Sequence, residues 1–512
     1  MGVRFGLTKK EIFKGENEVD FLASCHPING LAGFSKWYTR VIGNQLKPFH
    51  KEWIGPIVNR EVKRAAIAAP AGSGKSELFA LGLPSWYMWY NLSPMPPWEG
   101  LIVSTSEPQS KKLLQRYKDL LNNNALLQDL RPGTRDKTWS TAEVQLSNDT
   151  GLAVKPLNEN VRSYHPDFIV ADEVSAYDKV PDGRRIYKEY VSSRIGAKDG
   201  ILIAISTPSD EDDFLAELQG KTIYHSVTTH ALVNERGEPD INGESIWPDH
   251  PTGLYSKQKL MEKMEEIGPR AFALQYLCDT TMLVDDEDSP FPASLLTRSS
   301  TKELGFEYEP DPDGEYIAAY DPAFSVGGDY NAIIIAKIKN KKCFISRILR
   351  YKGSPEEAIS ILAELNSKFH FIKVIIDTNS GGWEVLRQAS KFNLPVVSFP
   401  FSPQVRVAAI HTTISRLNAG DIVFPMSEEV GNTARMVGLL FRELTRITRE
   451  KTKMGLITYV THTKHDDLAM CFIMLGQGLP EFSDDSNMIS SRSRRSVMRG
   501  RRSPKRGFGS RI

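Results

Sequence analysis

The sequence predicts an α/β protein built from two successive domains. Three observations predict this class. A short apolar strand at 65–68 runs into a glycine-rich loop and a helix, other apolar strands end in acidic or hydroxyl residues, and an acidic, proline-punctuated segment at 286–312 separates two such regions. Strands that alternate with helices predict sheets whose strand ends carry the functional side chains. We therefore expect one sheet and one site in each half of the chain.

The composition is that of a globular protein with several domains. At 512 residues, with 40% hydrophobic and 25% charged residues, the chain is too long for one ordinary core. No stretch approaches the roughly 18 apolar residues of a membrane span, so no membrane contact is expected, and "MGVRFGLTKKEIFKG" lacks the apolar core of a signal peptide. The four cysteines are scattered without a C-x-x-C pair, which favours a reducing, cytoplasmic-type compartment.

The changes of composition along the chain predict its domain boundaries. We expect an N-terminal extension (1–40), a P-loop domain (41–285) with a lid region near 210–285, a linker (286–312), a second α/β domain (313–482) and a basic, disordered tail (483–512). Residues 491–512 hold eight arginines, one lysine and no acid. This composition predicts disorder and contact with a polyanion, and a merely solubilising end is the alternative.

The first candidate site is a phosphate-binding loop for ATP. Residues 69–76 read A-P-A-G-S-G-K-S and fit G-x-x-x-x-G-K-[ST], except that Ala69 replaces the first glycine. Pro70 holds Ala69 extended, which explains why a glycine is not needed there. The two later glycines free backbone N–H groups for phosphate oxygens, Lys75 would reach the β- and γ-phosphates, and Ser76 would ligate Mg²⁺. The candidate nucleotide contacts in the loop are Ala69, Pro70, Ala71, Gly72, Ser73, Gly74, Lys75 and Ser76.

A partner carboxylate for this loop is expected at the end of a neighbouring strand. "HPDFIVADEVSAY" supplies an apolar strand at 168–171, followed by Asp172 and Glu173. Asp172 would hold Mg²⁺ through water, and Glu173 would polarise the attacking water. Another strand, "GILIAISTP", places Thr207 where a hydroxyl could sense the γ-phosphate. These motifs predict ATP hydrolysis by a RecA/ASCE-like P-loop domain.

Three further residues are candidates for the same site. Phe49 and His50 precede the loop in "LKPFHKEW", where an aromatic ring could stack on adenine. A core or surface role is the alternative for both. Arg162 lies in a polar loop ten residues before Asp172. It is either a cation delivered to a neighbouring subunit's nucleotide or a solvated charge.

The second candidate site is a set of aspartates in the other domain. "EYIAAYDPAFSVGGDYNAIIIAKIKNKKCFISRILRYKG" predicts three hairpin-linked strands, the first at 316–320 ending in Asp321. A helix and a fourth strand follow, and that strand ends in Asp377. The last apolar helix begins at "HDDLA", where one aspartate would be enough for a helix cap but Asp466 and Asp467 are both present. Strand ends and helix starts converge at a sheet edge, so these carboxylates are expected to meet.

Carboxylates that meet in this way repel one another unless a cation binds. Two Mg²⁺ or Mn²⁺ ions about 4 Å apart would neutralise them and clamp the attacking and leaving oxygens of a phosphodiester. This set of strands and acids resembles the RNase H-like nuclease fold, whose final helices often open Asp-x-Leu-Ala. The resemblance implies that Asp466, with Asp321 and Asp377, is a main ligand. Asp467 would bind the second metal more loosely or orient a water, and His465 could carry a proton. Helix capping is the alternative role for the pair, and both roles can coexist.

The order of these motifs resembles a known family. The β-β-β-α-β order, with acids on the first and fourth strands and a final helix, resembles the RNase H-like nuclease fold. Over roughly residues 40–480, the landmarks "APAGSGKS", "FIVADE", "ISTP", "YDPAFSVGGDYNAI", "IIDTNSGG" and "HDDLA" together resemble the large terminase subunit of tailed bacteriophages. The chain departs from that family at Ala69 and at His50, where many relatives have an adenine-reading glutamine.

The resemblance implies a viral DNA-packaging motor. Such a protein cuts concatemeric double-stranded DNA, docks on the portal protein of a procapsid and pumps DNA inward with ATP. It implies a small terminase subunit as a partner and a homo-oligomeric ring on the portal, usually a pentamer. It also implies action in the host cytoplasm during infection, transiently on the procapsid, and absence from the mature virion.

Two alternatives fit some of the same motifs. A helicase–nuclease of recombination or repair would share both sites but needs two RecA-like lobes, and only about 200 residues separate the loop from the linker. A DNA-binding scaffold with an inactive nuclease domain is the other alternative. Metal-dependent plasmid nicking distinguishes it from an active nuclease.

Overall fold

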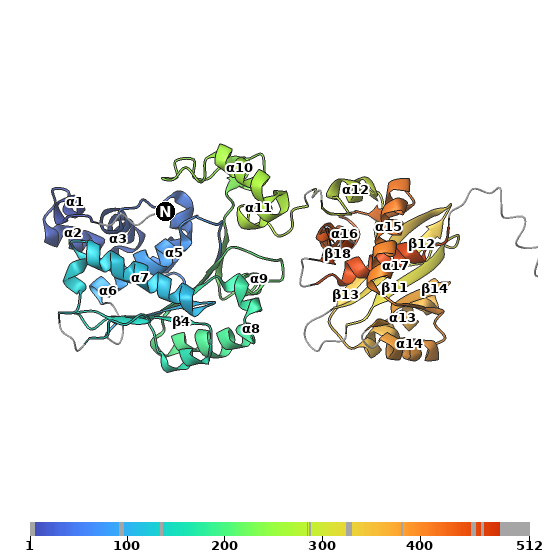
Figure 1. Cartoon of the computed structure of the whole chain (residues 1–512), viewed down its shortest axis with the longest axis horizontal. Coiled ribbons are helices and arrows are strands. Elements are labelled where there is room, and N and C mark those ends of the chain that lie inside the picture. Colours follow the sequence, from blue (N-terminus) through green and yellow to red (C-terminus); the bar gives the residue numbers. More distant parts are fainter. Residues whose placement is uncertain are drawn as a thin grey trace, which may run out of the picture. The chain divides into compact units, whose positions relative to one another are not determined.

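The structure is a computed structural model in which the chain divides into two compact units, Met1–Asp286 and Glu287–Ile512 (Figure 1). The structure describes residues 6–91, 97–133, 137–283, 285, 288–323, 330–379, 382–451, 457–461 and 465–481. The predicted basic tail, 483–512, lies outside the described residues. None of the described helices is long and apolar enough to span a bilayer.

The first unit is built on a seven-stranded sheet. Its strands, in spatial order, are β3 (Glu143–Gln145), β4 (Gly151–Pro156), β2 (Glu99–Ser104), β5 (Phe168–Asp172), β6 (Ile201–Ser206), β1 (Arg64–Ala68) and β7 (His225–Thr228). Neighbouring strands are parallel except β3 and β4. Strand β6 separates β1 from β5, which is the arrangement of RecA/ASCE-like ATPases. The predicted fold class of this unit is therefore confirmed.

Helices flank this sheet on both faces (Figure 1). The helices of the first unit are α1 (Lys9–Phe13), α2 (Glu18–Cys25), α3 (Gly30–Trp37), α4 (Pro48–Val58), α5 (Lys75–Glu77), α6 (Leu83–Tyr90), α7 (Glu107–Asn123), α8 (Gly183–Ile186), α9 (Phe214–Gln219), α10 (Lys257–Ile267) and α11 (Pro269–Gln275). Successive side chains of β1 point to opposite faces of the sheet, and each face is covered by its own layer of helices. Ala65 and Ile67 join the core that includes α4, α6 and α7, while Ala66 and Ala68 join the core that includes α8 and α9.

Short turns and one small hairpin connect these elements. The 3₁₀ turns are η1 (Pro27–Asn29), η4 (Leu127–Leu130), η5 (Glu159–Ser163), η6 (Val174–Lys179) and η8 (Ser192–Lys198). The π turns are η2 (Tyr38–Ile42), η3 (Leu78–Gly82) and η7 (Tyr187–Val191). A separate hairpin consists of β8 (Leu232–Val233) and β9 (Glu244–Ser245). It lies in the region 210–285 that was expected to be a lid, but β7 of the same region belongs to the main sheet.

The described part of the predicted N-terminal extension, 1–40, belongs to the core of the first unit. Phe34 and Trp37 of α3 are fully buried, and Trp37 Nε1 donates a hydrogen bond to Ser85 Oγ at 3.2 Å. In the predicted N-terminal extension, the aromatic side chains of α3 thus fill space against α6.

The second unit is built on another seven-stranded sheet. Its strands, in spatial order, are β10 (Ser300–Thr301), β16 (Ile422–Pro425), β13 (Lys342–Tyr351), β12 (Asn331–Lys339), β11 (Glu315–Asp321), β14 (Lys373–Asp377) and β15 (Val396–Phe399). Strands β11, β12 and β13 are antiparallel hairpin neighbours, whereas β14 and β15 continue the sheet in parallel with β11. The five strands β13-β12-β11-β14-β15 have the 3-2-1-4-5 order of the RNase H-like fold, which confirms the predicted class.

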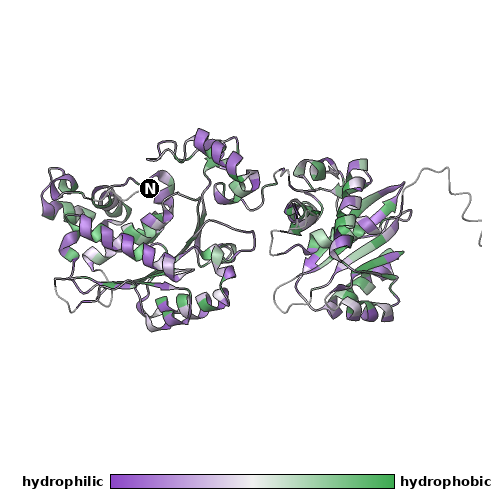
Figure 2. Ribbon diagram, in the orientation of Figure 1, coloured by the Kyte–Doolittle hydropathy of each residue, from purple (hydrophilic) through white to green (hydrophobic). Residues whose placement is uncertain are grey.

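Helices also cover both faces of the second sheet. They are α12 (Ala293–Arg298), α13 (Pro355–Phe369), α14 (Gly382–Lys391), α15 (Pro403–Ala419), α16 (Thr433–Thr445) and α17 (Asp467–Gly478), with an additional hairpin of β17 (Ile447–Lys451) and β18 (Ile457–Thr461). Helices α13 and α14 lie on one face, and α15 and α17 lie on the other (Figure 1). In both units the apolar strands lie between helices whose outward sides are hydrophilic (Figure 2). Cys471 of α17 donates to the carbonyl of Ala319 in β11 at 3.2 Å, so α17 lies directly on the sheet.

The predicted linker, 286–312, contains ordered structure of the second unit. Leu295 and Leu296 of α12 are buried, and Ser300 of β10 pairs with Phe424 of β16. The linker prediction is wrong for this stretch, because its few apolar residues pack against α15 and α16 and its backbone extends the sheet.

Candidate functional site

Strand β1 delivers the phosphate-binding loop to the carboxyl edge of the first sheet. Gly72 and Gly74 have φ angles of +73° and +87°, a region where a residue with a Cβ atom is strained. Gly74 directly precedes α5. Ala69 is not among the residues with positive φ, and its N–H donates to the Ser206 carbonyl at 3.0 Å. The backbone of Ala69 therefore does not require the glycine of the general pattern.

Lys75 is folded back onto its own loop. Its ammonium group donates to the hydroxyl of Thr207 at 2.8 Å and to the carbonyls of Ala69 and Pro70 at 3.2 Å each. Burial lowers the pKa of Lys75. The structure thus brings together Lys75 and Thr207, two residues predicted from separate motifs, and phosphate oxygens can replace the carbonyls as partners of the ammonium group.

Ser76 and Asp172 face each other across the neighbouring strands. The Ser76 hydroxyl lies 3.5 and 3.4 Å from the two carboxylate oxygens of Asp172. Burial, followed by the charge of Glu173, raises the pKa of Asp172 to about 6. A hydroxyl and a carboxylate in this position suit Mg²⁺, which prefers oxygen ligands and neutralises the carboxylate. Glu173 is exposed and has a φ angle of +56° at the turn that follows β5.

His50 and Phe49 are both buried, which favours the core role that was the alternative to stacking on adenine. His50 is 1% exposed, its Nε2 donates to the Ser73 carbonyl at 2.8 Å, and its Nδ1 accepts from the Lys47 N–H at 3.1 Å. Phe49 is buried against His50 and Trp53. Both ring nitrogens of His50 are therefore hydrogen-bonded to backbone groups, and one of these bonds holds the phosphate-binding loop at Ser73.

Further residues hold the loop from outside, and sequence reasoning missed them. The hydroxyl of Tyr255 donates to the Ala71 carbonyl at 2.9 Å, and the Ala71 N–H donates to the Gln275 carbonyl at 2.9 Å. A Cβ atom on Gly72 would lie 2.5 Å from Leu254. The aromatic cluster in "IWPDHPTGLY" was a signal in the sequence, but no motif links it to the loop.

Arg162 has partners within its own unit. It is 50% exposed, forms an ion pair with Glu159 at 3.2 Å and stacks over the Tyr190 ring at 3.9 Å. The structure does not bring it together with Lys75 or Asp172 through any contact. Action across a subunit boundary stays a prediction.

The aspartates of the second unit are brought together around Asp321. The register pairs Tyr320 of β11 with Ile376 of β14, so Asp321 and Asp377 end adjacent parallel strands. Burial, followed by the carboxylates of Asp467, Asp377 and Asp466 in that order, raises the pKa of Asp321 well above its usual value. Burial also raises the pKa of Asp377. Mutual repulsion of this kind is what the sequence pattern predicts for a cluster without a cation.

Asp466 and Asp467 have different surroundings. Asp466 is 35% exposed, accepts a hydrogen bond from the Thr461 hydroxyl at 2.9 Å and lies 3.5 Å from Arg406. Its side chain makes no capping hydrogen bond. Asp467 is 13% exposed and lies 3.8 Å from Arg350. Both carboxylates raise the pKa of Asp321, and the choice of Asp466 over Asp467 as a main metal ligand stays a prediction.

The described acids do not form an assembled metal site. Within the described part of the chain, no group of three or more His, Cys, Asp or Glu residues is arranged to hold a metal ion. Carboxylates are suitable donors for Mg²⁺ or Mn²⁺. Their present directions do not fit, because Asp466 and Asp467 face arginines.

Two residues that sequence reasoning missed belong to this cluster. Glu443 of α16 is buried, its carboxylate accepts from the Ala469 N–H at 3.0 Å, and burial raises its pKa to about 8. Arg350 of β13 lies 3.6 Å from Glu443. An acid within the apolar helix sequence "MVGLLFRELT" was a weak signal of a buried carboxylate, whereas nothing in "ISRILRY" distinguishes Arg350 from a surface charge.

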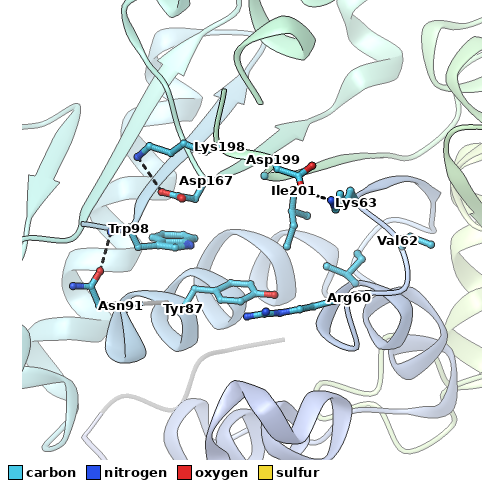
Figure 3. A pocket seen from close by; sticks show the side chains of 12 residues that line it. Arg60, Val62, Lys63, Tyr87, Asn91, Trp98, Asp167, Lys198, Asp199 and Ile201 are labelled. Carbon is cyan, nitrogen blue, oxygen red and sulfur yellow. Dashed lines mark hydrogen bonds and ion pairs between the residues drawn. The ribbon is translucent and has the colours of Figure 1, made fainter. Parts of the chain in front are cut away.

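A cavity of about 500 Å³ lies at the opposite edge of the first sheet (Figure 3). Lys63, Asp167 and Gly200, which line it, immediately precede β1, β5 and β6. Lys198 pairs with Asp167 at 3.2 Å in its wall. The phosphate-binding loop lies at the carboxyl ends of the same parallel strands, so this cavity is separate from the nucleotide site.

Comparisons with known proteins give matches among solved structures. No protein-family model and no curated protein matches the sequence. The large terminase of bacteriophage HK97 is similar at 15% identity, with 85% of this chain and 95% of that chain covered and a TM-score of 0.42. The large terminase of a thermophilic bacteriophage is similar at 11% identity, covering 81% and 93%, with a TM-score of 0.33. The large terminase nuclease of the thermophilic phage G20c is similar at 18% identity, covering 38% and 100%, with a TM-score of 0.31. Since all three scores are below 0.5, the fold assignment rests on the strand orders.

Proposed function

We propose that this chain is the large subunit of a viral DNA-packaging motor. It hydrolyses ATP in the first unit to move double-stranded DNA through a portal into a procapsid, and it cuts concatemeric DNA with the second unit. The observation that supports the proposal is the presence, in one chain, of a phosphate-binding loop on a RecA/ASCE-like sheet and an acid cluster at the edge of an RNase H-like sheet. The order of the sequence motifs favours a terminase over other proteins with these parts.

The residues of the first unit suit in-line attack of water on the γ-phosphate. The N–H groups of the loop and the ammonium group of Lys75 would bind the phosphates, after Lys75 exchanges its carbonyl partners for phosphate oxygens. Ser76 and Asp172 would hold Mg²⁺, which shields phosphate charge. Glu173 can turn towards the water because it is exposed.

Thr207 would report the state of the nucleotide. Its hydroxyl accepts from Lys75 and donates to the Ala69 carbonyl at 2.9 Å. When the ammonium group of Lys75 binds a γ-phosphate, the Thr207 hydroxyl loses Lys75 as a hydrogen-bond partner and keeps only the Ala69 carbonyl. The segment that follows β6 would therefore respond to hydrolysis, which is the step that a motor must couple to movement.

The acids of the second unit suit phosphodiester cleavage with divalent ions, but their arginine partners favour a second candidate. A DNA-binding protein with an inactive nuclease domain would keep Asp466 and Asp467 paired with Arg406 and Arg350 permanently. Nicking of supercoiled plasmid in Mn²⁺ distinguishes the two. An active nuclease nicks in Mn²⁺ and stops when the ion is chelated, whereas the inactive form gives no nicking in either condition.

The partners belong to the same proposal. They are double-stranded DNA, the portal protein, a small terminase subunit and further copies of this chain in a pentameric ring. The motor would act in the host cytoplasm and only transiently on the procapsid. The arginine-rich tail, outside the described residues, would add contacts to DNA or to an acidic partner surface.

Protection of DNA inside procapsids tests this function. Full-length protein, ATP, linear double-stranded DNA and procapsids are mixed, and the DNA is then treated with nuclease. We expect ATP-dependent protection with the wild-type chain and none with Lys75→Ala. Strand separation of the duplex without any protection would contradict packaging and favour the helicase–nuclease alternative.

A further inference from the structure

We infer that Arg350 is an internal counter-cation that holds the acid cluster of the second unit in place of a metal ion and competes with metal binding there. The inference rests on the proposed nuclease function. The carboxylates of the cluster are suitable ligands for divalent ions, but the side chains of Asp466 and Asp467 are turned towards arginines. The inference gives a reason for this difference.

The register of the sheet places Arg350 in line with Asp321. Ala332 of β12 is paired with Asp321 of β11 on one side and with Arg350 of β13 on the other. Residues that are directly opposite in neighbouring strands project to the same face of a sheet. Arg350 therefore points to the face on which Asp321 meets the other acids, two strands away.

The contacts of Arg350 show what its charge does. Its side chain is 7% exposed, and its Nη2 lies 3.6 Å from Glu443 Oε1 and 3.8 Å from Asp467 Oδ2. The guanidinium also lies 4.0 Å over the ring of Tyr330. One buried cation thus lies between the buried carboxyl group of Glu443 and the partly exposed carboxylate of Asp467, so a divalent ion that binds Asp467 would share this carboxylate with Arg350.

The arginine is held by charge and not by directed hydrogen bonds. Both carboxylate distances exceed hydrogen-bonding distance, and Arg350 Nε and Glu443 Oε1 are buried with no hydrogen-bond partner in the described part of the chain. Stable buried arginine–carboxylate pairs usually have two parallel hydrogen bonds. Buried groups that lack such bonds call for an explanation. A cation that is loosely held among carboxylates can be displaced by another cation, which explains this arrangement.

Competition makes metal binding depend on DNA. An ion that binds Asp467 must displace Arg350, which costs free energy while the guanidinium has no other anion to pair with. A phosphodiester supplies that anion, since guanidinium groups pair well with phosphate. Arg350 would transfer to the phosphate and leave Asp467 and Glu443 to the ion. Metal and DNA should therefore bind cooperatively, and each should raise the affinity of the other by the same factor.

Calorimetric titration of Mn²⁺ into the full-length chain without nucleotide tests this. Four variants are compared with wild type: Arg350→Met, Arg350→Lys, Arg347→Met and Asp321→Asn. Arg347 lies on the same strand but stacks over Tyr308 at 5.0 Å, so it serves as the matched control. The Mn²⁺ binding that is lost in Asp321→Asn is the binding that occurs at the acid cluster.

We expect Arg350→Met to bind Mn²⁺ about tenfold more tightly than wild type, the usual size of such a coupling. Arg350→Lys should show a smaller increase in Mn²⁺ affinity, because lysine keeps the positive charge but has a shorter side chain without the guanidinium group. Arg347→Met should bind Mn²⁺ as wild type does. A non-cleavable phosphorothioate duplex should tighten Mn²⁺ binding in wild type and have no such effect in Arg350→Met. If Arg350→Met does not fold, Arg350→Lys decides the outcome.

Unchanged or weaker Mn²⁺ binding in the folded Arg350 variants would overturn the inference and leave the nuclease proposal intact. A wild-type chain with no Mn²⁺ site that Asp321→Asn removes would instead overturn the proposed nuclease site. The two failures are thus distinguishable.

Discussion

At the residue scale, Asp466 and Asp467 show how neighbours in the chain take different roles. Asp467 is the first residue of α17, whereas Asp466 precedes the helix with a non-helical backbone, so different local structure positions the two side chains. Asp467 lies 3.8 Å from Arg350, while Asp466 accepts a hydrogen bond from the Thr461 hydroxyl at 2.9 Å. Because Asp467 is the less exposed of the two and lies beside Arg350, we expect it to contribute more to cleavage than Asp466, contrary to the register predicted from the sequence.

Replacing each aspartate by asparagine in turn separates the roles of Asp466 and Asp467. Asp467→Asn should reduce Mn²⁺-dependent nicking as much as Asp321→Asn does, by roughly 10³-fold if metal binding fails. Asp466→Asn should leave measurable cutting. Initial rates of plasmid nicking at equal protein concentration provide the comparison. If Asp466→Asn abolished nicking and Asp467→Asn retained it, Asp466 would be the main ligand, as the sequence predicts.

His50 contributes a pH dependence to the stability of the first unit. Burial lowers its pKa to about 4, below the ordinary value of 6.5, so the unfolded chain binds the proton more readily between these values. The stability from neutral His50 is complete above about pH 6.5 and falls as the pH drops towards 4. The loss from this group alone is about 2 kcal/mol at pH 5.

His50→Gln tests this contribution, since its amide can keep the bonds to the Ser73 carbonyl and the Lys47 N–H. Unfolding in urea is compared at about pH 7.5 and about pH 5 for wild type, His50→Gln and the exposed control His165→Gln. We expect the loss between the two pH values to be about 2 kcal/mol smaller in His50→Gln only. An equal loss in all three proteins would show that His50 is not buried in its neutral form.

At the element scale, the phosphate-binding loop depends on segments far away in the sequence. Helix α4 supports it through His50, and the segment before α10 holds it through Tyr255. A loop whose carbonyls are fixed in this way keeps its N–H groups directed at the phosphate before the nucleotide arrives, which lowers the entropic cost of binding.

Tyr255→Phe removes one of these supports without changing the volume of the ring. We expect the KM for ATP to rise about fivefold with a smaller change in kcat, because a single hydrogen bond contributes about 1 kcal/mol. Steady-state ATP turnover measures both constants. Tyr224→Phe is the matched control, since its hydroxyl contacts Tyr187 at 3.2 Å and not the loop. Equal effects of the two substitutions would contradict a specific role of Tyr255.

The sequence predicts the elements that carry local patterns and misses contacts that depend on tertiary packing. Strand ends at Asp172, Asp321 and Asp377 follow from apolar runs that stop at an acid, and both sheet orders agree with the predicted classes. The role of His50 could not be predicted, because burial depends on α4 packing under the loop. Arg350 could not be predicted either, since only the register of β13 brings it to the acids.

At the scale of the whole molecule, each unit has its own sheet, core and candidate site, so the two activities should be separable. The tail adds a third part, whose last 22 positions (491–512) hold nine cationic residues and which lies outside the described residues. Because arginines attract phosphate through their charge, the contribution of the tail to DNA binding should depend strongly on salt.

Truncation after Phe482 tests the tail. ATP turnover and plasmid nicking should be unchanged, while DNA affinity falls and the slope of log affinity against log salt decreases by about 0.9 for each lost phosphate contact. Fluorescence anisotropy of a labelled duplex at several salt concentrations measures this. An identical salt slope for the truncated and full-length chains would show that the tail makes no phosphate contacts.

The central claim is that one chain carries two independent sites, an ATPase site at Lys75 and a nuclease site at Asp321. The most direct measurement is ATP turnover and Mn²⁺-dependent plasmid nicking on the same preparations of Lys75→Ala and Asp321→Asn. Lys75→Ala should lose ATP turnover and keep nicking, because phosphate charge loses its partner in the first unit only. Asp321→Asn should keep ATP turnover and lose nicking. Loss of both activities in each folded variant would contradict the account.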